Sequence, residues 1–450
     1  MRFIIIILVT FFYSCRGVSQ SFEGAWKGDL AVPNGSLPLL FSLQKGDSWT
    51  GTVRSPSQTR LDFKLNVIEV TGDSIHMKSA ALGMSYRGRI AADGEHVDGT
   101  FSQGNYAAAL RLGRYDSTQT VKRPQQPIGP YPYDRKEVSF ENTASDVTLA
   151  GTLTQPKEPG RYPAVILVSG SGPQNRNSEV EDHKPFEVLA DYLTRQGIIV
   201  LRYDDRGIAQ STGNFLQSNI ADFSRDALAG LTFLKTQTNV DSARLGMIGH
   251  SEGGLISLLL AGQHAPGLRF IVSLAGPAMP IDSLMVLQLY HVGKSQGMSE
   301  AELAKVRPIN RKNFEIVKSN LPAPVAMSQL LKNMRSVGGA SGALQKELQV
   351  MLLEPYRYFM RIDPVPFIQK INIPLYAAFG DKDIQVPAKE NQKSLVANLP
   401  GNPQSRIKTY PNLNHLLQPA KTGALQEYYT IETTIEPELL KDIANWINGL

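Results

Sequence analysis

Cysteine is nearly absent from this sequence, since Cys15 is the single one among 450 residues. One cysteine cannot form a disulfide within the chain, and it excludes zinc or iron–sulfur sites built from cysteine ligands. An excess of one charge is also missing, because 46 Lys and Arg face 41 Asp and Glu, a formal net charge of +5. No Lys/Arg-rich cluster of the nucleic-acid-binding kind stands out, so we expect no nucleic-acid partner.

Long apolar runs are absent apart from one near the N-terminus. Residues 3–13 form a largely apolar stretch behind Arg2, shorter than the roughly 18 apolar residues that a membrane-spanning helix needs. We expect no membrane span and interpret residues 1–20 as a signal peptide cleaved after Gln20. The alternative is that Cys15 is a lipidated first residue. Either reading predicts an exported protein, periplasmic or extracellular, and the second makes it a lipoprotein.

The first folded region is expected to be a β domain. The composition, 42% apolar and 19% charged, excludes a disordered, collagenous or coiled-coil chain, and the length allows two or three domains. Within residues 21–115, apolar and polar residues alternate, as at Leu61, Phe63, Leu65 and Val67, and turn signals such as Asn34-Gly35 recur. This pattern predicts a small antiparallel barrel or sandwich with an accessory role.

Residues 116–135 are rich in proline and predict a semi-rigid linker. From 136 to 450 the pattern changes, because short apolar runs now alternate with helical stretches. Such runs suit strands that are buried on both faces of a parallel sheet, so we predict a doubly wound α/β domain. A segment without a convincing strand, about 280–372, is predicted to be a helical lid, with Ser299 and Glu302 spaced as a capping box.

The motif Gly249-His250-Ser251-Glu252-Gly253 predicts a nucleophile. It fits the pattern G-x-S-x-G and lies between an apolar strand-like run, Leu245–Ile248, and a helical run, Leu255–Leu260. A sharp strand-to-helix turn exposes the central serine above the sheet, and the flanking glycines leave room for that turn. Ser251 is therefore the candidate nucleophile.

A serine nucleophile needs a base, and the chain offers seven histidines. His415 follows the apparent last strand, Ile407–Tyr410, which matches the chain order Ser…Asp…His expected in this fold. His250 neighbours Ser251, but adjacent side chains on a strand point apart. His183 lies on the correct side of the sheet but out of chain order. We therefore predict His415 as the base.

The orienting carboxylate is expected after the penultimate strand, Leu375–Phe379. The following loop offers Asp381 and Asp383. Asp383 fits the pattern G-x-x-D-x-x-V-P over Gly380–Pro387, so we favour Asp383 and keep Asp381 as the alternative. The carboxylate accepts the histidine Nδ1–H and stabilises the imidazolium that forms on proton transfer.

Two backbone donors are needed for the oxyanion of the tetrahedral intermediate. One is predicted to be the N–H of Glu252, directly after the nucleophile. The other is expected from the glycine-rich loop at 169–174, where we favour the Ser171 N–H and keep Gly172 as the alternative. A further charged motif, Arg202–Gly207, follows another predicted strand, and there we favour structural ion pairing over contact with substrate.

On these residues, the region from about 136 to 450 resembles the α/β-hydrolase superfamily. The segments GHSEGG at 249–254, RYDDRG at 202–207 and GDKDIQVP at 380–387 look like those of secreted bacterial esterases in the serine-aminopeptidase-like and dienelactone-hydrolase-like branches. The N-terminal module resembles small β domains that precede such hydrolases in some bacteria. The chain departs from many relatives at Ser169-Gly170, where they have His-Gly.

The resemblance implies an exported serine hydrolase that cleaves carboxylic esters through an acyl-enzyme on Ser251, His415 and Asp383. A serine peptidase or amidase acting on short peptides is the alternative, and it calls for a carboxylate such as Glu252 or Glu315 to bind the substrate amine. A catalytically inactive binding protein on the same fold is the third hypothesis. We expect a small-molecule substrate, no metal and no organic cofactor, and the sequence indicates no oligomeric state.

Overall fold

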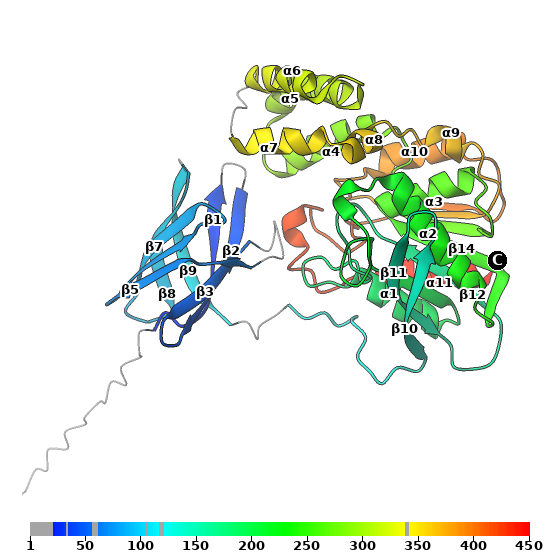
Figure 1. The fold of residues 1–450 in the computed structure, drawn as a ribbon, viewed down its shortest axis with the longest axis horizontal. Helices are drawn as coiled ribbons and strands as arrows, with labels where there is room; N and C mark the ends of the chain where they lie inside the picture. Colours follow the sequence, from blue (N-terminus) through cyan, green and yellow to red (C-terminus); the bar gives the residue numbers. More distant parts are fainter. Residues whose placement is uncertain (1–20, 33–34, 56–61, 105, 117–120, 338–341) are drawn as a thin grey trace, which may run out of the picture. The chain divides into compact units, whose positions relative to one another are not determined.

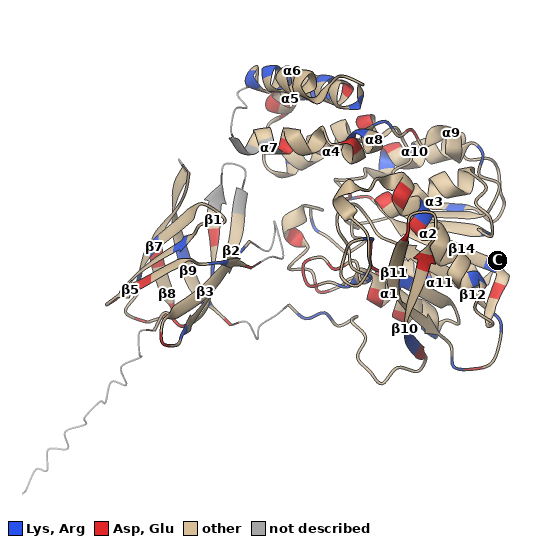
Figure 2. Cartoon of the chain, in the orientation of Figure 1, with Lys and Arg blue, Asp and Glu red and all other residues tan. Residues whose placement is uncertain are grey.

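The computed structural model describes residues 21–32, 35–55, 62–104, 106–116, 121–337 and 342–450. The predicted signal peptide at 1–20, with Cys15, lies outside these residues. The chain divides into two compact units, residues 1–120 and 121–450. Blue and red segments, which mark basic and acidic residues, are mixed along the ribbon of both units (Figure 2).

Unit 1 is a nine-stranded antiparallel sheet in the order β4-β3-β2-β1-β9-β8-β7-β6-β5. Most strands therefore pair with their neighbours in the chain, and the sheet curls around its own core (Figure 1). The strands are β1 (Gly24–Val32), β2 (Gly35–Lys45), β3 (Trp49–Arg54), β4 (Phe63–Lys64), β5 (Val67–Thr71), β6 (Ser74–Ser79), β7 (Met84–Ile90), β8 (His96–Gln103) and β9 (Tyr106–Tyr115). Of the alternating run, Phe63 lies in β4 and Val67 begins β5, while Leu61 lies outside the described residues.

The core of unit 1 contains aromatic side chains that lie on the inner face of the sheet. Trp26 and Tyr86 are almost fully buried. The Tyr86 hydroxyl lies 3.0 Å from the Val97 carbonyl oxygen and 3.1 Å from that of Leu110. A side chain at Gly99 would overlap the Tyr86 ring, because its Cβ would lie 2.6 Å from the ring. The glycine therefore makes room for the tyrosine in this core.

Most of the Pro-rich segment is part of unit 2, and residues 117–120 of the predicted linker lie outside the described residues. Residues 121–133 belong to unit 2, and β10 begins at Asp134. The Arg123 guanidinium donates to the carbonyl oxygens of Glu181, Tyr429 and Ile431 at 2.8 Å each. The expectation of a linker over 116–135 is therefore too long: prolines prevent regular structure here, yet side-chain hydrogen bonds fasten the segment to unit 2.

Unit 2 contains a mixed eight-stranded sheet in the order β10-β11-β13-β12-β14-β15-β16-β17. The first pairs, β10 with β11 and β11 with β13, are antiparallel, and the remaining pairs are parallel. The strands are β10 (Asp134–Asn142), β11 (Val147–Gln155), β12 (Tyr162–Val168), β13 (Ile199–Tyr203), β14 (Val240–His250), β15 (Phe270–Leu274), β16 (Leu375–Gly380) and β17 (Arg406–Tyr410). The central strands are buried apolar runs, as the sequence predicts.

Helices cover both faces of this sheet (Figure 1). One face packs against α1 (Pro185–Arg195) and α11 (Pro437–Asn448), and the other against α2 (Ile220–Lys235), α3 (Glu252–Gly262) and α10 (Ala388–Asn398). Two apolar cores result, one on each side of the sheet. The predicted doubly wound α/β arrangement is confirmed. Short 3-10 helices lie in loops, η1 (Phe215–Gln217) and η2 (Leu425–Glu427).

The segment between β15 and β16 is helical where the structure describes it. In the view of Figure 1 its helices lie at the top of unit 2, above α2 and α3. The Ser299 hydroxyl accepts from the Glu302 N–H while the Glu302 carboxylate accepts from the Ser299 N–H, so the predicted capping box is confirmed. Its helices are α4 (Ile281–Ser295), α5 (Glu300–Lys318), α6 (Ala323–Arg335), α7 (Gly342–Met351), α8 (Glu354–Met360) and α9 (Val365–Ile368).

Candidate active site

Ser251 lies on the sharp turn between β14 and α3. Its backbone has φ 54° and ψ −117°, a region that a non-glycine residue rarely adopts. The turn is closed by a hydrogen bond of 2.9 Å from the Ser251 N–H to the Leu274 carbonyl on β15. The serine therefore projects from the carboxyl edge of the parallel strands, where sites of open α/β sheets are built.

The flanking glycines allow this turn because no side chain fits there. A Cβ on Gly249 would lie 1.9 Å from the Gly253 carbonyl oxygen, and a Cβ on Gly253 would lie 2.1 Å from the Val168 carbonyl oxygen. Both neighbours are backbone atoms, which cannot rotate away as a side chain can. The two glycines of G-x-S-x-G are thus required by the close approach of β14, α3 and β12.

We predict that Gly249→Ala destabilises unit 2 by about 3 kcal/mol, because the added methyl group overlaps backbone that cannot give way. The measurement is thermal and urea unfolding of the full chain. Gly401→Ala is the matched control, since a Cβ there meets nothing within 4 Å and its φ is not positive. Equal unfolding midpoints for the two variants would contradict this account of the turn.

His415 reaches Ser251 from the loop after β17. Its Nε2 lies 3.0 Å from Ser251 Oγ, within hydrogen-bond distance. The loop is braced by the buried Asn414, whose side-chain oxygen accepts from the N–H groups of Leu416 and Gln418 at 3.0 Å. The imidazole is therefore held where it can take the serine proton.

Asp383, not Asp381, contacts the imidazole. Asp383 Oδ2 lies 2.8 Å from His415 Nδ1, and its Oδ1 accepts from the N–H groups of Gln385 and Val386 at 2.8 and 2.9 Å. The side chain of Asp383 is fully buried. Asp381 instead accepts from the Asn412 N–H at 2.6 Å, and so supports the neighbouring loop. The three residues predicted from sequence, Ser251, His415 and Asp383, thus form one hydrogen-bonded chain.

Two other histidines, His250 and His183, are hydrogen-bonded to other groups and do not contact Ser251 Oγ. The imidazole of His250 lies with Nε2 2.9 Å from the His415 carbonyl oxygen, and burial, with the nearby His415, lowers the His250 pKa to about 4. A neutral His250 can therefore donate to this carbonyl and help to hold the His415 loop. His183 contacts Thr434 Oγ1 at 2.8 Å and the Tyr428 carbonyl oxygen at 3.0 Å, and burial lowers its pKa to about 4.

The loop at 169–174, after β12, runs close to the nucleophile. A Cβ on Gly170 would lie 3.2 Å from Ser251 Cβ, a tight contact, so a glycine here eases the close approach of the backbone to the nucleophile. In the part of the chain that the structure describes, the N–H groups of Ser171 and Glu252 donate to no other protein group. Both remain candidate oxyanion donors. The Ser171 hydroxyl donates to Glu252 Oε2 at 2.8 Å, which ties the loop to the first residue of α3.

A second carboxyl group besides that of Asp383, the one of Asp205, contacts this loop at Ser169 and Gln174. It is buried, and burial, together with the negative charges of Glu252 and Asp226, raises its pKa from 3.8 to about 7. Burial also raises the pKa of Glu252, while its hydrogen bond from Ser171 opposes that shift. Ser169, Gly170, Asp205 and Glu252 help to line a very small cavity here, of about 10 Å³. The sequence predicts structural ion pairing for Arg202–Gly207, and Asp204 and Arg206 do form ion pairs, with Arg176 and Asp226. The contacts of Asp205 with the loop at 169–174 could not be predicted, because only the fold brings the loops after β12 and β13 together.

The raised pKa of Asp205 predicts a stability that depends on pH. An acid whose pKa is higher in the folded state binds its proton more tightly there, so its contribution is full below pH about 4 and is lost as the pH rises towards 7. We expect the free energy of unfolding of the wild type, relative to Asp205→Asn, to fall by up to about 4 kcal/mol over this range. Urea unfolding at several pH values measures it, and a constant difference would contradict the shift.

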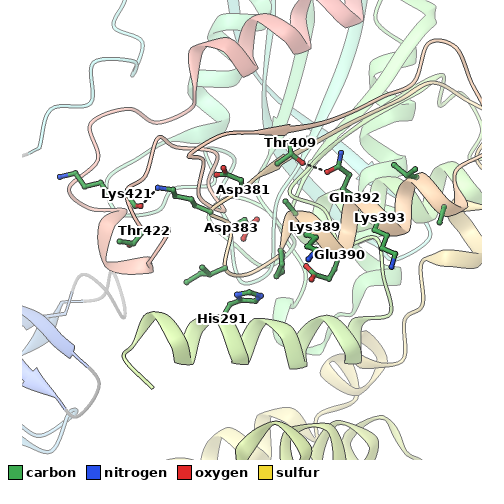
Figure 3. A pocket seen from close by; sticks show the side chains of 16 residues that line it. His291, Asp381, Asp383, Lys389, Glu390, Gln392, Lys393, Thr409, Lys421 and Thr422 are labelled. Carbon is green, nitrogen blue, oxygen red and sulfur yellow. Dashed lines mark hydrogen bonds between the residues drawn. The ribbon is translucent and has the colours of Figure 1, made fainter. Parts of the chain in front are cut away.

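A cavity of about 1030 Å³ opens beside Asp383 (Figure 3). Its lining includes His291 from α4, Asp383 and several residues of α10, but neither Ser251 nor His415. Helix α4 of the helical segment therefore lines a large cavity next to Asp383, the carboxylate that contacts His415. Lysines surround it, among them Lys382, Lys389, Lys393 and Lys421.

Metal ligation and membrane spanning find no support in the described part of the chain. No group of three or more His, Cys, Asp or Glu side chains is placed there to hold a metal ion. None of the helices described has the length and apolar character needed to cross a bilayer.

The chain is similar in sequence to one protein family and to an esterase, and in structure to several solved proteins. Residues 180–323, which include Ser251 but not Asp383 or His415, match the family described as serine aminopeptidase, S33. Esterase EstD of Thermotoga maritima is 26% identical over 363 residues, which cover 77% of each chain. Among solved structures, the hypothetical protein PA2218 of Pseudomonas aeruginosa is 15% identical, with a TM-score of 0.47, over 75% of this chain and 99% of that one.

The esterase Pf2001 of Pyrococcus furiosus is 17% identical to this chain, with a TM-score of 0.43, over 74% of this chain and 98% of its own. The sheet order of unit 2, the strand–serine–helix turn and the two sequence similarities point the same way. Unit 2 therefore has the α/β-hydrolase fold, preceded in the sequence by a β domain, and the chain is similar to the serine aminopeptidase family over residues 180–323 and to Esterase EstD.

Proposed function

We propose that this chain hydrolyses carboxylic esters through an acyl-enzyme formed on Ser251. The observation that carries the proposal is the hydrogen-bonded chain from Ser251 Oγ to His415 and on to Asp383, with distances of 3.0 and 2.8 Å. A serine, a base and an orienting carboxylate in contact are what an activated nucleophile needs. The similarity to an esterase supports the ester as the bond that is cleaved.

In the proposed reaction, Ser251 Oγ attacks the ester carbonyl carbon while His415 Nε2 takes the serine proton. The resulting oxyanion accepts from the N–H groups of Glu252 and Ser171, and the positive end of α3 adds to its stabilisation. Collapse expels the alcohol, which receives the proton from His415. Water then attacks the carbonyl carbon of the acyl group while His415 Nε2 takes a proton from the water. Collapse of this second tetrahedral intermediate releases the carboxylic acid and returns the proton to Ser251 Oγ.

A peptidase or amidase on the same residues is the second candidate, favoured by the match to the serine aminopeptidase family. An aminopeptidase needs a carboxylate that is free to bind the substrate amine. Glu252 accepts from the Ser171 hydroxyl, and Glu315 pairs with Lys318 at 3.1 Å, so both carboxylates already have partners. These contacts favour the ester over the peptide as substrate.

The test compares two series of chromogenic substrates. We expect turnover of p-nitrophenyl esters from acetate to palmitate, with a maximum at one chain length, and much slower turnover of aminoacyl p-nitroanilides. Hydroxylamine added during turnover should yield the hydroxamate of the acyl group, which reports an acyl-enzyme. Faster cleavage of the anilides than of the esters would select the peptidase. Turnover of neither series by the folded protein would favour the binding protein.

We also propose that the protein is exported, on the charged and apolar pattern of residues 1–20. Intact-mass measurement of the protein from its own cell envelope and medium separates the two routes. A chain that begins at Ser21 indicates signal-peptide cleavage, and a diacylated Cys15 at the first position indicates a lipoprotein. An intact Met1 in the mature protein would contradict export.

A further inference from the structure

The charged motif Arg202–Gly207 is not used by the proposed reaction, yet its two aspartates face the loop at 169–174 and its continuation. Asp205 Oδ1 accepts from the Ser169 hydroxyl at 2.6 Å, and Oδ2 accepts from the Gln174 N–H at 2.9 Å. The Asp205 N–H in turn donates to the Gln174 carbonyl at 3.1 Å. One buried residue thus holds both ends of the loop.

Asp204 binds Arg176, a residue that follows the loop at 169–174. Its carboxylate accepts from the N–H of Arg176 at 2.8 Å and from the Arg176 guanidinium at 2.6 and 3.1 Å. Arg176 also pairs with Glu137 on β10. The chain that leaves the loop is therefore anchored to the sheet, which leaves the loop little freedom to move away from Ser251.

The middle of the loop has its own anchor. The Ser171 hydroxyl donates to the Glu252 carboxylate, and the backbone at Gly170 passes close to Ser251 Cβ. The loop residue that carries the predicted second oxyanion donor therefore lies between fixed points: Ser169 and Gln174 on Asp205, and Ser171 on Glu252. A backbone N–H stabilises an oxyanion only when it is held in place before the reaction.

Packing alone does not explain a carboxyl group at position 205. In the described part of the chain, Asp205 has no ion-pair partner, and the charged groups that contribute most to its pKa shift, Glu252 and Asp226, are both negative and raise that pKa. A carboxyl group buried in this way is unfavourable compared with an apolar side chain of similar size. What the carboxyl group provides, and an apolar side chain cannot, is the pair of hydrogen bonds that shape the loop.

We propose that Asp205 is a positioning residue: it fixes the loop at 169–174 so that the Ser171 N–H points at the oxyanion formed at Ser251. This inference rests on the proposed ester hydrolysis. Asp205 acts through the loop and touches no reacting atom. The role depends on the two hydrogen bonds and not on a negative charge.

The test compares two substitutions at one position. Asp205→Leu keeps the branched outline of the side chain, with bulkier methyl groups in place of the oxygens, and removes both hydrogen bonds. Asp205→Asn keeps them, because the amide oxygen can accept from the Gln174 N–H while the amide NH2 donates to the Ser169 hydroxyl. With the best p-nitrophenyl ester, we expect kcat to fall by about 10- to 100-fold in the leucine variant, with KM within about twofold, and to stay near wild type in the asparagine variant.

Two further readouts separate positioning from a general loss of structure. A trifluoromethyl ketone with the same chain forms a tetrahedral adduct, so its inhibition constant should rise by the same factor as kcat falls. Asp226→Asn is the control, because Asp226 is buried and bound to Arg206 but does not touch the loop. We expect it to lower the unfolding temperature and to leave kcat and ketone affinity near wild type.

A double-mutant cycle with Ser169→Ala completes the test. If the two residues act through one hydrogen bond, Ser169→Ala lowers kcat in the wild type and has little further effect in Asp205→Leu. A leucine variant with wild-type kcat and ketone affinity, or an asparagine variant as slow as the leucine one, would overturn the inference while Ser251 still reacts with an active-site probe. A wild type whose Ser251 does not react would instead overturn the proposed function, and this inference with it.

Discussion

Ser251→Ala is expected to lower kcat/KM for ester hydrolysis by roughly 10⁴- to 10⁶-fold. The substitution removes Oγ, which is the atom that contacts His415 and forms the bond to the acyl group in the proposed reaction. It keeps Cβ, so the left-handed backbone of the turn costs the alanine variant no more than the serine enzyme. We therefore expect an inactive protein with an unfolding temperature close to that of the wild type.

Ser257→Ala is the matched control for this variant. Ser257 lies on α3, the helix that follows Ser251, and is buried, but its hydroxyl donates to the Gly253 carbonyl at 2.9 Å, one turn earlier in the helix. Its loss should change kcat/KM by less than tenfold, which is about 1.4 kcal/mol. If Ser251→Ala retained as much activity as Ser257→Ala, the nucleophile would have to be another residue.

Asp383→Asn is expected to lower kcat by about 10⁴-fold, through the tautomer of His415. Two backbone N–H groups, those of Gln385 and Val386, point at Asp383 Oδ1. An asparagine must turn its carbonyl oxygen to these donors, which leaves its NH2 group facing His415 Nδ1. The imidazole then carries its proton on Nε2, where it faces Ser251 Oγ and can no longer accept the serine proton.

Asp381→Asn separates this effect from a general change of the loop. Asp381 is two residues away and accepts from the Asn412 N–H, without contact to His415. An asparagine can accept the same hydrogen bond through its amide oxygen, so we expect activity within a few-fold of the wild type. Measurement of kcat for both variants at saturating ester decides the matter, and a greater loss at Asp381 would reverse the assignment of the acid.

Much of the fold follows from local pattern. The strands β12, β14, β15 and β16 are apolar because both faces of the sheet are covered, and such runs are visible in the sequence. The sequence does not delimit α10, since most of its residues are polar and its buried face includes Asn391, which donates to the Pro387 carbonyl and accepts from the Ala278 N–H. By contrast, α11 carries a regular apolar face, at Leu439, Leu440, Ile443 and Ile447, that periodicity could have found.

The candidate site also contains residues that the sequence predicts and contacts that it does not predict. Ser251 and His415 could be predicted because a strand–turn–helix motif and chain order point to single residues. The choice between Asp381 and Asp383 depends on which carboxylate the loop turns towards His415, and that is a matter of three-dimensional geometry. The contacts of Asp205, Glu252 and His250 join segments far apart in the sequence, so local pattern carries no signal for them.

Reaction with a fluorophosphonate probe tests the central claim most directly, because such probes phosphonylate only activated serines. The labelled protein is digested and the modified residue is located by tandem mass spectrometry. The proposed site predicts one phosphonyl group per chain, on Ser251, and no labelling of Ser251→Ala or of the unfolded wild type. Labelling of a different serine, or equal labelling of Ser251→Ala, would contradict the assignment of Ser251 as the nucleophile.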